Sequence, residues 1–401
     1  MEKLIGFLII LCSLFACKDT STSSPEATGD LFELKDNQAI GINFSNDLSY
    51  TNDFNVYKYR NFYNGGGVAI GDINNDGLAD VFMTANQGPN RLFLNKGNWQ
   101  FEDITETAGV GGERAWSTGV TMADVNADGL LDIYVCNSGD IAGDNKENEL
   151  YINQGNLQFA EEAAAYGLND KGFSTHASFF DYDKDGDLDV YILNNSFQAI
   201  GSFNLRKNER PVRDELGGDK LMQNQDGKFV DVSEQAGIYG SVIGFGLGVT
   251  IGDVNNDNWE DIFVSNDFFE RDYLYLNQHD GTFREDLTNE MQSISGASMG
   301  ADMADINNDG YQDIFVTEML PSEYQRLKTV TTFEDWDKYQ YNVKNGYHHQ
   351  FTRNVLHLNR GDNAFSEVSR LAGIEASDWS WGALFFDMDN DGYKDLFIAN
   401  G

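Results

Sequence analysis

The sequence predicts an all-β protein, a β-propeller built from four-stranded blades. Three observations indicate this fold. A nine-residue acidic pattern, Asp-x-Asn/Asp-x-Asp-Gly-x-x-Asp, occurs six times, once with Asn in place of its Gly. Short apolar runs of strand length surround every copy. The chain also has 41 Gly against 4 Pro, with 28 Phe and 18 Tyr, which is typical of many short strands joined by glycine turns.

The six copies are spaced like structural repeats. They start at Asp72, Asp124, Asp181, Asp253, Asp305 and Asp387. Two of the intervals are 52 residues long, which sets the basic unit. The other three are 57, 72 and 82 residues long, so they indicate insertions into that unit.

Each unit contains four strand-like runs. In the first unit these are residues 67–71 before the acidic loop, 81–83 after it, then 91–95 and 101–105, followed by Ala108-Gly109-Val110. Four short strands in about fifty residues are the signature of a propeller blade. A helical solenoid would show a 3.6-residue periodicity instead, and these runs do not.

The two ends of the chain suggest how the propeller closes. Residues 31–34 look like a fourth strand, and residues 39–42 like its Ala-Gly-Ile exit, without three strands before them. We expect this segment to complete the last blade. Residue 401 follows the second strand of the sixth unit, so we expect residues 31–401 to be a propeller truncated at its C-terminus, in a piece of a longer protein.

The first thirty residues are typical of a bacterial lipoprotein. Residues 1–16 have a charged start and an apolar run, which is too short for a stable transmembrane helix and suits a signal peptide. The run ends in Leu-Phe-Ala-Cys, which resembles a lipobox, so we expect Cys17 to carry the lipid. Residues 17–30 are rich in Ser and Thr and are interpreted as a flexible tether. The membrane is therefore an expected partner, with the protein anchored by lipid at the bacterial outer membrane, on its cell-surface or periplasmic face.

One cysteine remains after the signal peptide and the lipid site. Cys136 lies in the apolar run Ile-Tyr-Val-Cys, so we expect a buried structural thiol. A single thiol provides no disulfide framework, and stabilisation of this extracytoplasmic fold must come from elsewhere.

The charge balance points to a bound cation. The formal net charge is −38, which argues against nucleic acid, whose phosphates need Lys and Arg. Self-repulsion of this size in a compact domain indicates that cations compensate the densest acidic clusters.

The acidic loops have the pattern of a calcium site. Oxygen ligands at positions 1, 3 and 5, the carbonyl of position 7 and a carboxylate at position 9 suit a hard cation bound inside one tight turn. Position 12, where an EF-hand has its bidentate Glu, is apolar in every copy, so each loop is expected to join two strands rather than two helices. These apolar residues are Met83, Val135, Ile192, Val264, Val316 and Ile398.

We expect up to six structural Ca²⁺ ions. Magnesium is the weaker candidate, and a metal-free Asx-rich turn is the alternative for any single loop. In the fourth loop Asn258 replaces Gly at position 6, and Asn tolerates the left-handed conformation needed there. The expected ligands are Asp72, Asn74, Asp76, Leu78 and Asp80; Asp124, Asn126, Asp128, Leu130 and Asp132; Asp181, Asp183, Asp185, Asp187 and Asp189; Asp253, Asn255, Asp257, Trp259 and Asp261; Asp305, Asn307, Asp309, Tyr311 and Asp313; and Asp387, Asp389, Asp391, Tyr393 and Asp395.

With these loops, the sequence resembles the FG-GAP/VCBS-repeat propellers, which include the integrin α-subunit head. It is more closely similar to bacterial cartilage acidic protein-like lipoproteins. The stretches that carry the resemblance are residues 63–69, 245–248, 266–273, 378–381 and 381–383. The resemblance implies a seven-bladed propeller and, in longer relatives, a C-terminal domain of the ASPIC/UnbV type.

The insertions share one place in the repeat. Residues 197–218, 318–353 and 138–148 all fall between the second and third strands of their units, so we expect them on the face opposite the calcium loops. Long loops gathered at one end of a rigid scaffold are typical of a binding surface, although they also occur as variable decoration. The candidate ligand residues are Arg206, Arg210, Arg213, Trp336, Tyr339 and His348.

Two classes of function remain. The first is a calcium-stabilised binding or adhesion module that recognises a glycan or a protein through stacking aromatics and Arg. The second is a polysaccharide-active enzyme, a lyase or hydrolase, with its site on the same face. The sequence favours binding, because no catalytic motif can be assigned and adjacent His348 and His349 point in different directions. It does not identify the ligand.

Overall fold

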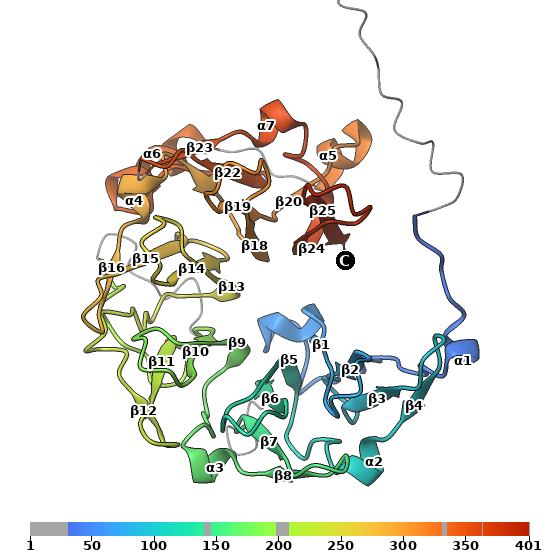
Figure 1. Ribbon diagram of the computed structural model, residues 1–401. Helices are drawn as coiled ribbons and strands as arrows, with labels where there is room; N and C mark the ends of the chain where they lie inside the picture. Colours follow the sequence, from blue (N-terminus) through green and yellow to red (C-terminus); the bar gives the residue numbers. More distant parts are fainter. Residues whose placement is uncertain (1–30, 140–145, 198–207, 331–334, 363, 401) are drawn as a thin grey trace, which may run out of the picture. The chain divides into compact units, whose positions relative to one another are not determined.

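Antiparallel sheets of four strands repeat along the chain in the computed structural model (Figure 1). The structure describes residues 31–139, 146–197, 208–330, 335–362 and 364–400. Residues 35–401 form one compact unit, and the fold described is that of this unit. The prediction of a β-propeller with four-stranded blades is confirmed.

In each blade the strands follow one another in sequence order. Blade 1 is β1 (Val68–Gly71), β2 (Asp80–Met83), β3 (Arg91–Asn95) and β4 (Phe101–Asp103); blade 2 is β5 (Ser117–Ala123), β6 (Asp132–Asn137), β7 (Glu149–Asn153) and β8 (Phe159–Glu161). Blade 3 is β9 (Ser174–Phe180), β10 (Asp189–Asn194), β11 (Lys220–Asn224) and β12 (Phe229–Asp231); blade 4 is β13 (Gly246–Gly252), β14 (Asp261–Asn266), β15 (Tyr273–Asn277) and β16 (Phe283–Glu285). Blade 5 is β18 (Ala301–Ala304), β19 (Asp313–Val316), β22 (Val355–Asn359) and β23 (Phe365–Glu367), and the described part of blade 6 is β24 (Asp378–Phe386) and β25 (Asp395–Asn400).

Each acidic loop joins the first and second strands of its blade, as the apolar residues at position 12 predict. Loop 1, for example, connects β1 to β2, whose register pairs Gly71 with Asp80. Because successive strands are antiparallel, the connections between second and third strands lie at the opposite end of the blades. The long insertions of blades 3 and 5 therefore emerge on the face opposite the acidic loops. We call this the insertion face.

The remaining elements are short. The insertion of blade 5 contains β20 (Met319–Leu320), α5 (Tyr324–Val330), α6 (Trp336–Lys344) and β21 (Gln350–Phe351), and β21 pairs in parallel with β17 (Ile294–Ser295). The other helices are α1 (Asn37–Ile40), the 3-10 helix η1 (Arg60–Tyr63), α2 (Thr105–Ala108), α3 (Ala163–Tyr166), α4 (Leu287–Glu290) and α7 (Ser369–Ala372). No helix of the described residues is long and apolar enough to cross a membrane.

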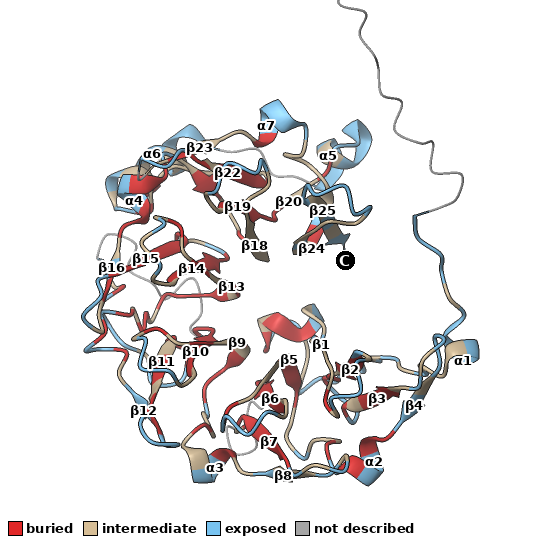
Figure 2. Ribbon diagram, viewed as in Figure 1, coloured by how far each residue is buried: buried red, intermediate tan, exposed pale blue. Residues whose placement is uncertain are grey.

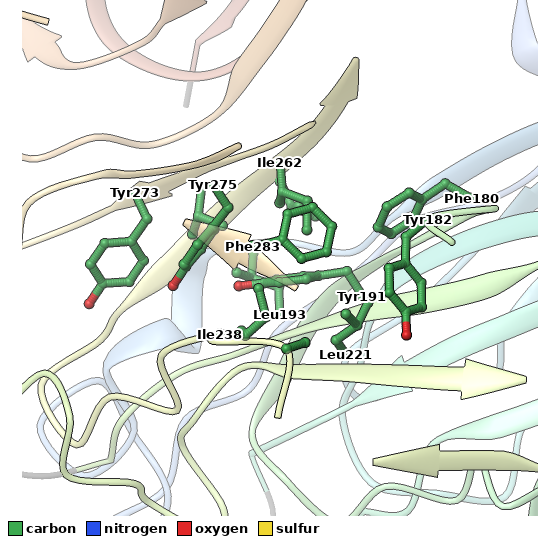
Figure 3. Packing of buried hydrophobic residues seen from close by; sticks show 13 residues of the cluster. Phe180, Tyr182, Tyr191, Leu193, Leu221, Ile238, Ile262, Tyr273, Tyr275 and Phe283 are labelled. Carbon is green, nitrogen blue, oxygen red and sulfur yellow. The ribbon is translucent and has the colours of Figure 1, made fainter. Parts of the chain in front are cut away.

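The core lies between neighbouring blades. The second strands β6, β10 and β14 are buried along their whole length, because each packs against a blade on both faces (Figure 2). Between blades 3 and 4, Tyr191 and Leu221 from one blade pack with Ile262 and Tyr275 from the next (Figure 3). Cys136 is fully buried in the equivalent cluster between blades 2 and 3, as expected for a structural thiol.

Hydroxyl groups near the inner strands link each blade to the next. The Thr84 Oγ1 of blade 1 donates to the Thr118 carbonyl oxygen of blade 2 at 2.5 Å, and Thr118 Oγ1 donates to the Ser174 carbonyl of blade 3 at 2.8 Å. The series continues with Thr175 to Gly246, Ser265 to Met299 and Thr317 to Trp381. These bonds and the interblade cores fasten each blade to the blade that follows it in the sequence.

The N-terminal prediction is half right. Residues 31–34 are not a strand, because they pair with no strand of the described chain, and an isolated strand is unstable in water. The expected exit is present: α1 ends at Gly41 in the left-handed conformation, as α2 and α3 end at Gly109 and Gly167. A Cβ at Gly167 would lie 2.7 Å from the Phe229 carbonyl oxygen of the next blade, which explains the glycine.

Candidate functional site

Each acidic loop turns its side chains toward its own backbone. In loop 1 the Asp72 carboxylate accepts hydrogen bonds from the backbone N–H groups of Asp76, at 3.0 Å, and Gly77, at 2.7 Å. The Asn74 side-chain oxygen accepts from Asp76, and the Asp76 carboxylate accepts from the N–H of Leu78. The same four bonds recur in loops 2, 4, 5 and 6. Positions 1, 3 and 5 therefore present their oxygens to the inside of one turn.

Two positions of each loop have left-handed backbone. Position 6 has positive φ in all six loops, and Asn258 adopts it with φ 66°, as expected for the residue that replaces Gly. Position 4 is also left-handed, with φ between 58° and 59° at Asn75, Ala127, Lys184, Asn256, Asn308 and Asn390. Our sequence reasoning missed position 4. The signal was available, because four of the six residues there are Asn, which tolerates this conformation.

The Asp at position 9 is fully buried in loops 1 to 5. Asp80 accepts from the Ile73 N–H within its own loop, at 3.1 Å, and from the Asn95 N–H at the end of the third strand, at 2.7 Å. Burial raises the pKa of the equivalent Asp132 to about 6 and that of Asp261 to about 7. The Asp at position 9 thus fixes the loop to the blade through its hydrogen bonds. Burial disfavours the charged form of this carboxylate.

Loop 3 carries Asp at positions 1, 3, 5, 7 and 9, and it is the most strongly acidic site. The carboxylates of Asp181, Asp183 and Asp185 each offer an oxygen within 4.8 Å of the others. Oδ1 of Asp181, Asp183 and Asp187 is buried without a hydrogen-bond partner among the described residues. Unpaired buried carboxylate oxygens that face like charges fit a bound divalent cation. Asp387, Asp389 and Asp395 form a second such group in loop 6.

In blades 2, 4 and 5 the Asn at the end of the third strand connects the loops of two blades. The Asn153 amide nitrogen donates to the Ile73 carbonyl oxygen of loop 1 at 2.9 Å, and Asn277 donates to Tyr182 of loop 3 at 2.8 Å. At position 4, Asn75 donates to the Gly129 carbonyl of the next loop at 2.9 Å. The sequence signal was the Asn that closes each third run, namely Asn95, Asn153, Asn224, Asn277 and Asn359.

On the insertion face, Arg210 is buried rather than presented to solvent. Its Nε lies 2.6 Å from Glu270 Oε1, and its guanidinium lies over the Tyr347 ring at 5.1 Å. The two insertions therefore meet around Arg210. Arg213 is exposed and donates to the Ile238 carbonyl oxygen at 2.9 Å. Arg206 lies outside the described residues.

The aromatic candidates cluster around α6. Trp336 is 70% exposed and stacks on Tyr339, with ring centroids 5.4 Å apart. The Tyr339 hydroxyl lies 2.6 Å from His349 Nδ1, whereas His348 Nε2 lies 2.8 Å from the Met291 carbonyl oxygen. The two adjacent histidines thus have different hydrogen-bond partners. Trp336 is the aromatic residue of this group that is exposed to solvent.

A cavity that sequence reasoning did not predict opens on the same face. Its volume is about 200 Å³, and residues 57–61, Phe173, residues 195–197 and Phe245 line it. A larger cavity, about 390 Å³, lies among the inner strands, and its lining includes Gly67, Gly119, Gly248, Gly300 and Gly382. No sequence signal marks the smaller cavity, since its residues come from four separate segments.

The repeats match a known family. The model of the FG-GAP-like repeat matches residues 72–135, 140–192, 253–316 and 346–398, which together are more than half of the chain. Each matched segment begins at or contains an acidic loop and a second strand, which are the parts of the blade that hold the site described above.

The chain is also similar to two curated relatives, and one solved structure aligns with it. The chain is 29% identical over 178 residues to cartilage acidic protein 1 of Xenopus tropicalis, covering 44% of this chain and 26% of that protein. It is 29% identical over 119 residues to integrin alpha-3 of Mus musculus, covering 26% of this chain and 11% of that protein. A solved lectin from Agrocybe aegerita, described as recognising non-reducing terminal N-acetylglucosamine, aligns with 16% identity and a TM-score of 0.45 over 82% of this chain and 72% of the lectin. The chain thus spans about a quarter or less of the two curated relatives.

Proposed function

Because the chain belongs to the FG-GAP-like repeat family, we propose that it is a calcium-stabilised, lipid-anchored extracytoplasmic binding module. Its ligand, a glycan or a protein, is recognised on the insertion face. The acidic loops on the other face stabilise the fold by binding calcium. Cys17, which lies outside the described residues, carries the lipid that anchors the protein to the bacterial outer membrane.

The donor sets support calcium in the loops. The side chains of positions 1, 3, 5 and 9 and the carbonyl of position 7 would hold the ion, which neutralises the clustered carboxylates when bound. Loop 3 supports this most directly, since the Oδ1 atoms of Asp181 and Asp183, at positions 1 and 3, are buried without a donor among the described residues. With a net charge of −38 and no disulfide among the described residues, bound cations are an effective source of stability.

One observation carries the assignment of the ligand to the insertion face: a cavity opens there beside the exposed ring of Tyr57. Trp336 and Tyr57 are 70% and 96% exposed, and the cavity of about 200 Å³ lies beside Tyr57. Exposed aromatic rings next to a concavity are typical of binding surfaces, because they bury a large area with little loss of side-chain entropy. The opposite face presents acidic loops whose oxygens are turned inward.

The test compares aromatic residues on the two faces. Calcium-loaded full-length protein is screened on glycan and protein arrays, and each ligand found is titrated against the double variant Trp336→Ala/Tyr57→Ala. The matched control is Trp99→Ala, because Trp99 is also well exposed but lies in the β3–β4 turn at the loop end of its blade. We expect the double variant to weaken binding at least tenfold and the control to change it less than twofold. Equal effects of the two variants would contradict the assignment.

A further inference from the structure

We propose that the cavity beside Asn195 is a subsite for one neutral pyranose ring of a glycan. Asn195 would hydrogen-bond two adjacent hydroxyl groups, and the surrounding aromatic rings would cover the C–H face of the sugar. This inference rests on the proposed function, since it places a glycan subsite on the insertion face. It goes further by assigning a role to Asn195 and to the buried rings of the cavity wall, which the proposed function leaves unassigned.

Four segments from three blades converge on the cavity. Residues 57–61, which include the start of η1, precede β1, Phe173 precedes β9, and Phe245 precedes β13. Residues 195–197 follow β10. All four positions are at the insertion-face end of their strands. The volume of about 200 Å³ equals roughly six or seven water molecules at about 30 Å³ each, which is room for one sugar ring rather than two.

Asn195 is held by its backbone while its side chain is unpaired. Its N–H donates to the Phe173 carbonyl oxygen at 3.0 Å, and the residue forms an antiparallel bridge with Phe245. The residue is 2% exposed, yet neither its amide nitrogen nor its amide oxygen has a partner among the described residues. A buried donor and acceptor without partners are costly, so this amide gains by meeting a group that pairs with both.

In the equivalent residue of blade 1, Asn86, the side-chain amide is hydrogen-bonded through both its nitrogen and its oxygen. Asn86 lies six residues after Asp80, as Asn195 lies six residues after Asp189. The Asn86 nitrogen donates to the carbonyl oxygens of Gly65 and Ser117, both at 2.8 Å, and its oxygen accepts from Asn46 at 2.7 Å. The repeat therefore pairs this amide with protein groups in blade 1 and leaves it unpaired in blade 3.

The residues that line the cavity favour a neutral sugar ring with two adjacent hydroxyl groups. An amide presents a donor and an acceptor side by side, and two neighbouring hydroxyls can serve both. Phe173 and Phe197 are stacked at 4.8 Å, and Tyr59 lies nearly parallel to Phe197 at 6.4 Å. The Tyr59 hydroxyl already bonds Ser138 at 3.1 Å, so these rings offer apolar surface, which suits the C–H face of a sugar.

The two cations that line the cavity, Lys58 and Arg60, are engaged elsewhere, which argues against a phosphorylated ligand. Lys58 Nζ lies 3.7 Å from Asp53 Oδ1. The Arg60 guanidinium lies over the Phe268 ring at 5.3 Å and close enough to Asp267 for their charges to interact. A nucleotide would use the same amide and the same rings, but its phosphate would need an unpaired cation. The wall therefore favours a sugar over a nucleotide.

The test uses two Asn→Ala variants at the equivalent positions. Calcium-loaded full-length protein is titrated by calorimetry with methyl α- and β-pyranosides of glucose, galactose and mannose, and with adenosine as the competing probe. We expect at least one pyranoside to bind, Asn195→Ala to weaken it at least tenfold, and Asn86→Ala to leave it within twofold. The Tm should show the reverse, falling in Asn86→Ala, which loses three native bonds, and staying unchanged or rising in Asn195→Ala.

Several results would overturn the inference. Pyranoside affinity within twofold of the wild type in Asn195→Ala would place the sugar elsewhere, and Asn195-dependent binding of adenosine alone would replace the sugar by a nucleobase. A Tm loss in Asn195→Ala as large as in Asn86→Ala would show that the amide is paired in the native protein. If no pyranoside binds while the arrays still yield a ligand for the insertion face, the subsite fails and the proposed function stands. If neither binds, both fail.

Discussion

The side-chain amide of Asn153 donates to the carbonyl oxygen of Ile73 at 2.9 Å, although the two residues are 80 apart in the sequence. Ile73 is position 2 of the first acidic loop, and Asn153 closes the third strand of the next blade. The same amide also donates to the Leu131 carbonyl of its own blade at 3.1 Å. The Asn153 amide therefore links the first acidic loop to the second.

Replacing Asn153 by Ala should destabilise the protein measurably. The substitution leaves two carbonyl oxygens without their donor in a buried place, at a cost of about 1–3 kcal/mol. Urea denaturation followed by circular dichroism should show a lower free energy of unfolding with an unchanged m-value. The control is Lys228→Ala, whose residue is exposed in the β11–β12 turn, and it should lie within about 0.5 kcal/mol of the wild type. Equal stability of Asn153→Ala and the wild type would show that the bond does not couple the blades.

The left-handed position 6 of loop 4 gives a second prediction. Asn258 has φ 66°, a conformation that costs a residue with a Cβ roughly 1–2 kcal/mol, and Asn less than most. Asn258→Ala should therefore lower stability by about 1 kcal/mol, whereas Asn258→Gly should keep or slightly raise it. Thermal unfolding in saturating calcium measures both variants. Equal Tm values for the Ala and Gly variants would contradict the backbone explanation.

Loop 3 and loop 2 allow a reciprocal test of the calcium proposal. Asp183→Asn removes one of several like charges from loop 3, and Asn126→Asp adds one to loop 2 at the same position. Without calcium, the first variant should raise Tm and the second should lower it, because like charges at short distance repel. The rise in Tm on adding calcium should shrink in Asp183→Asn and grow in Asn126→Asp. Thermal scans in excess chelator and in millimolar calcium provide both values.

An unchanged Tm of the wild-type protein in chelator would contradict calcium as a structural ion. A rise that is equal in magnesium and calcium would contradict the choice of metal.

The blades were predictable because the repeat is local. The loop pattern, the apolar residues at position 12 and the Ala-Gly exits all lie within one unit, and the structure confirms the strands that they predict. Residues 31–34 show where local pattern fails: an apolar tetrapeptide becomes a strand only where a neighbour provides hydrogen bonds, and sequence alone does not name that neighbour.

The insertion face was predictable in place but not in detail. The position of the insertions between second and third strands is a matter of chain order, and the structure confirms it. The environment of Arg210 depends on Glu270 in blade 4 and Tyr347 in the insertion of blade 5, so a residue expected to meet a ligand is buried instead. The cavity beside Asn195 likewise needs four distant segments, and Asn195 and Asn86 differ only in what the fold brings to them.

The last prediction concerns the pH dependence of stability that arises from Asp219, a buried residue at the insertion-face end of blade 3. Asp219 is buried, and burial raises its pKa to about 7 although it accepts from the Asn194 N–H at 3.0 Å and the Tyr191 hydroxyl at 2.9 Å. In blade 2 the equivalent residue is already an amide: Asn148 accepts from the Asn137 N–H at 2.8 Å and donates to the Tyr134 hydroxyl at 2.9 Å.

Asp219→Asn should therefore fit the site and change the pH dependence of stability. The pKa of Asp219 is higher in the folded state than in the unfolded state, so folding is favoured by its protonated form. Its contribution is complete below about pH 4 and is lost as the pH rises through about 7, up to about 4 kcal/mol by pH 8. The variant should match the wild type near pH 4 and exceed it at pH 8, as measured by urea unfolding at fixed calcium. A variant that is less stable than the wild type at pH 8 would show that the carboxylate is the better partner for Asn194 and Tyr191.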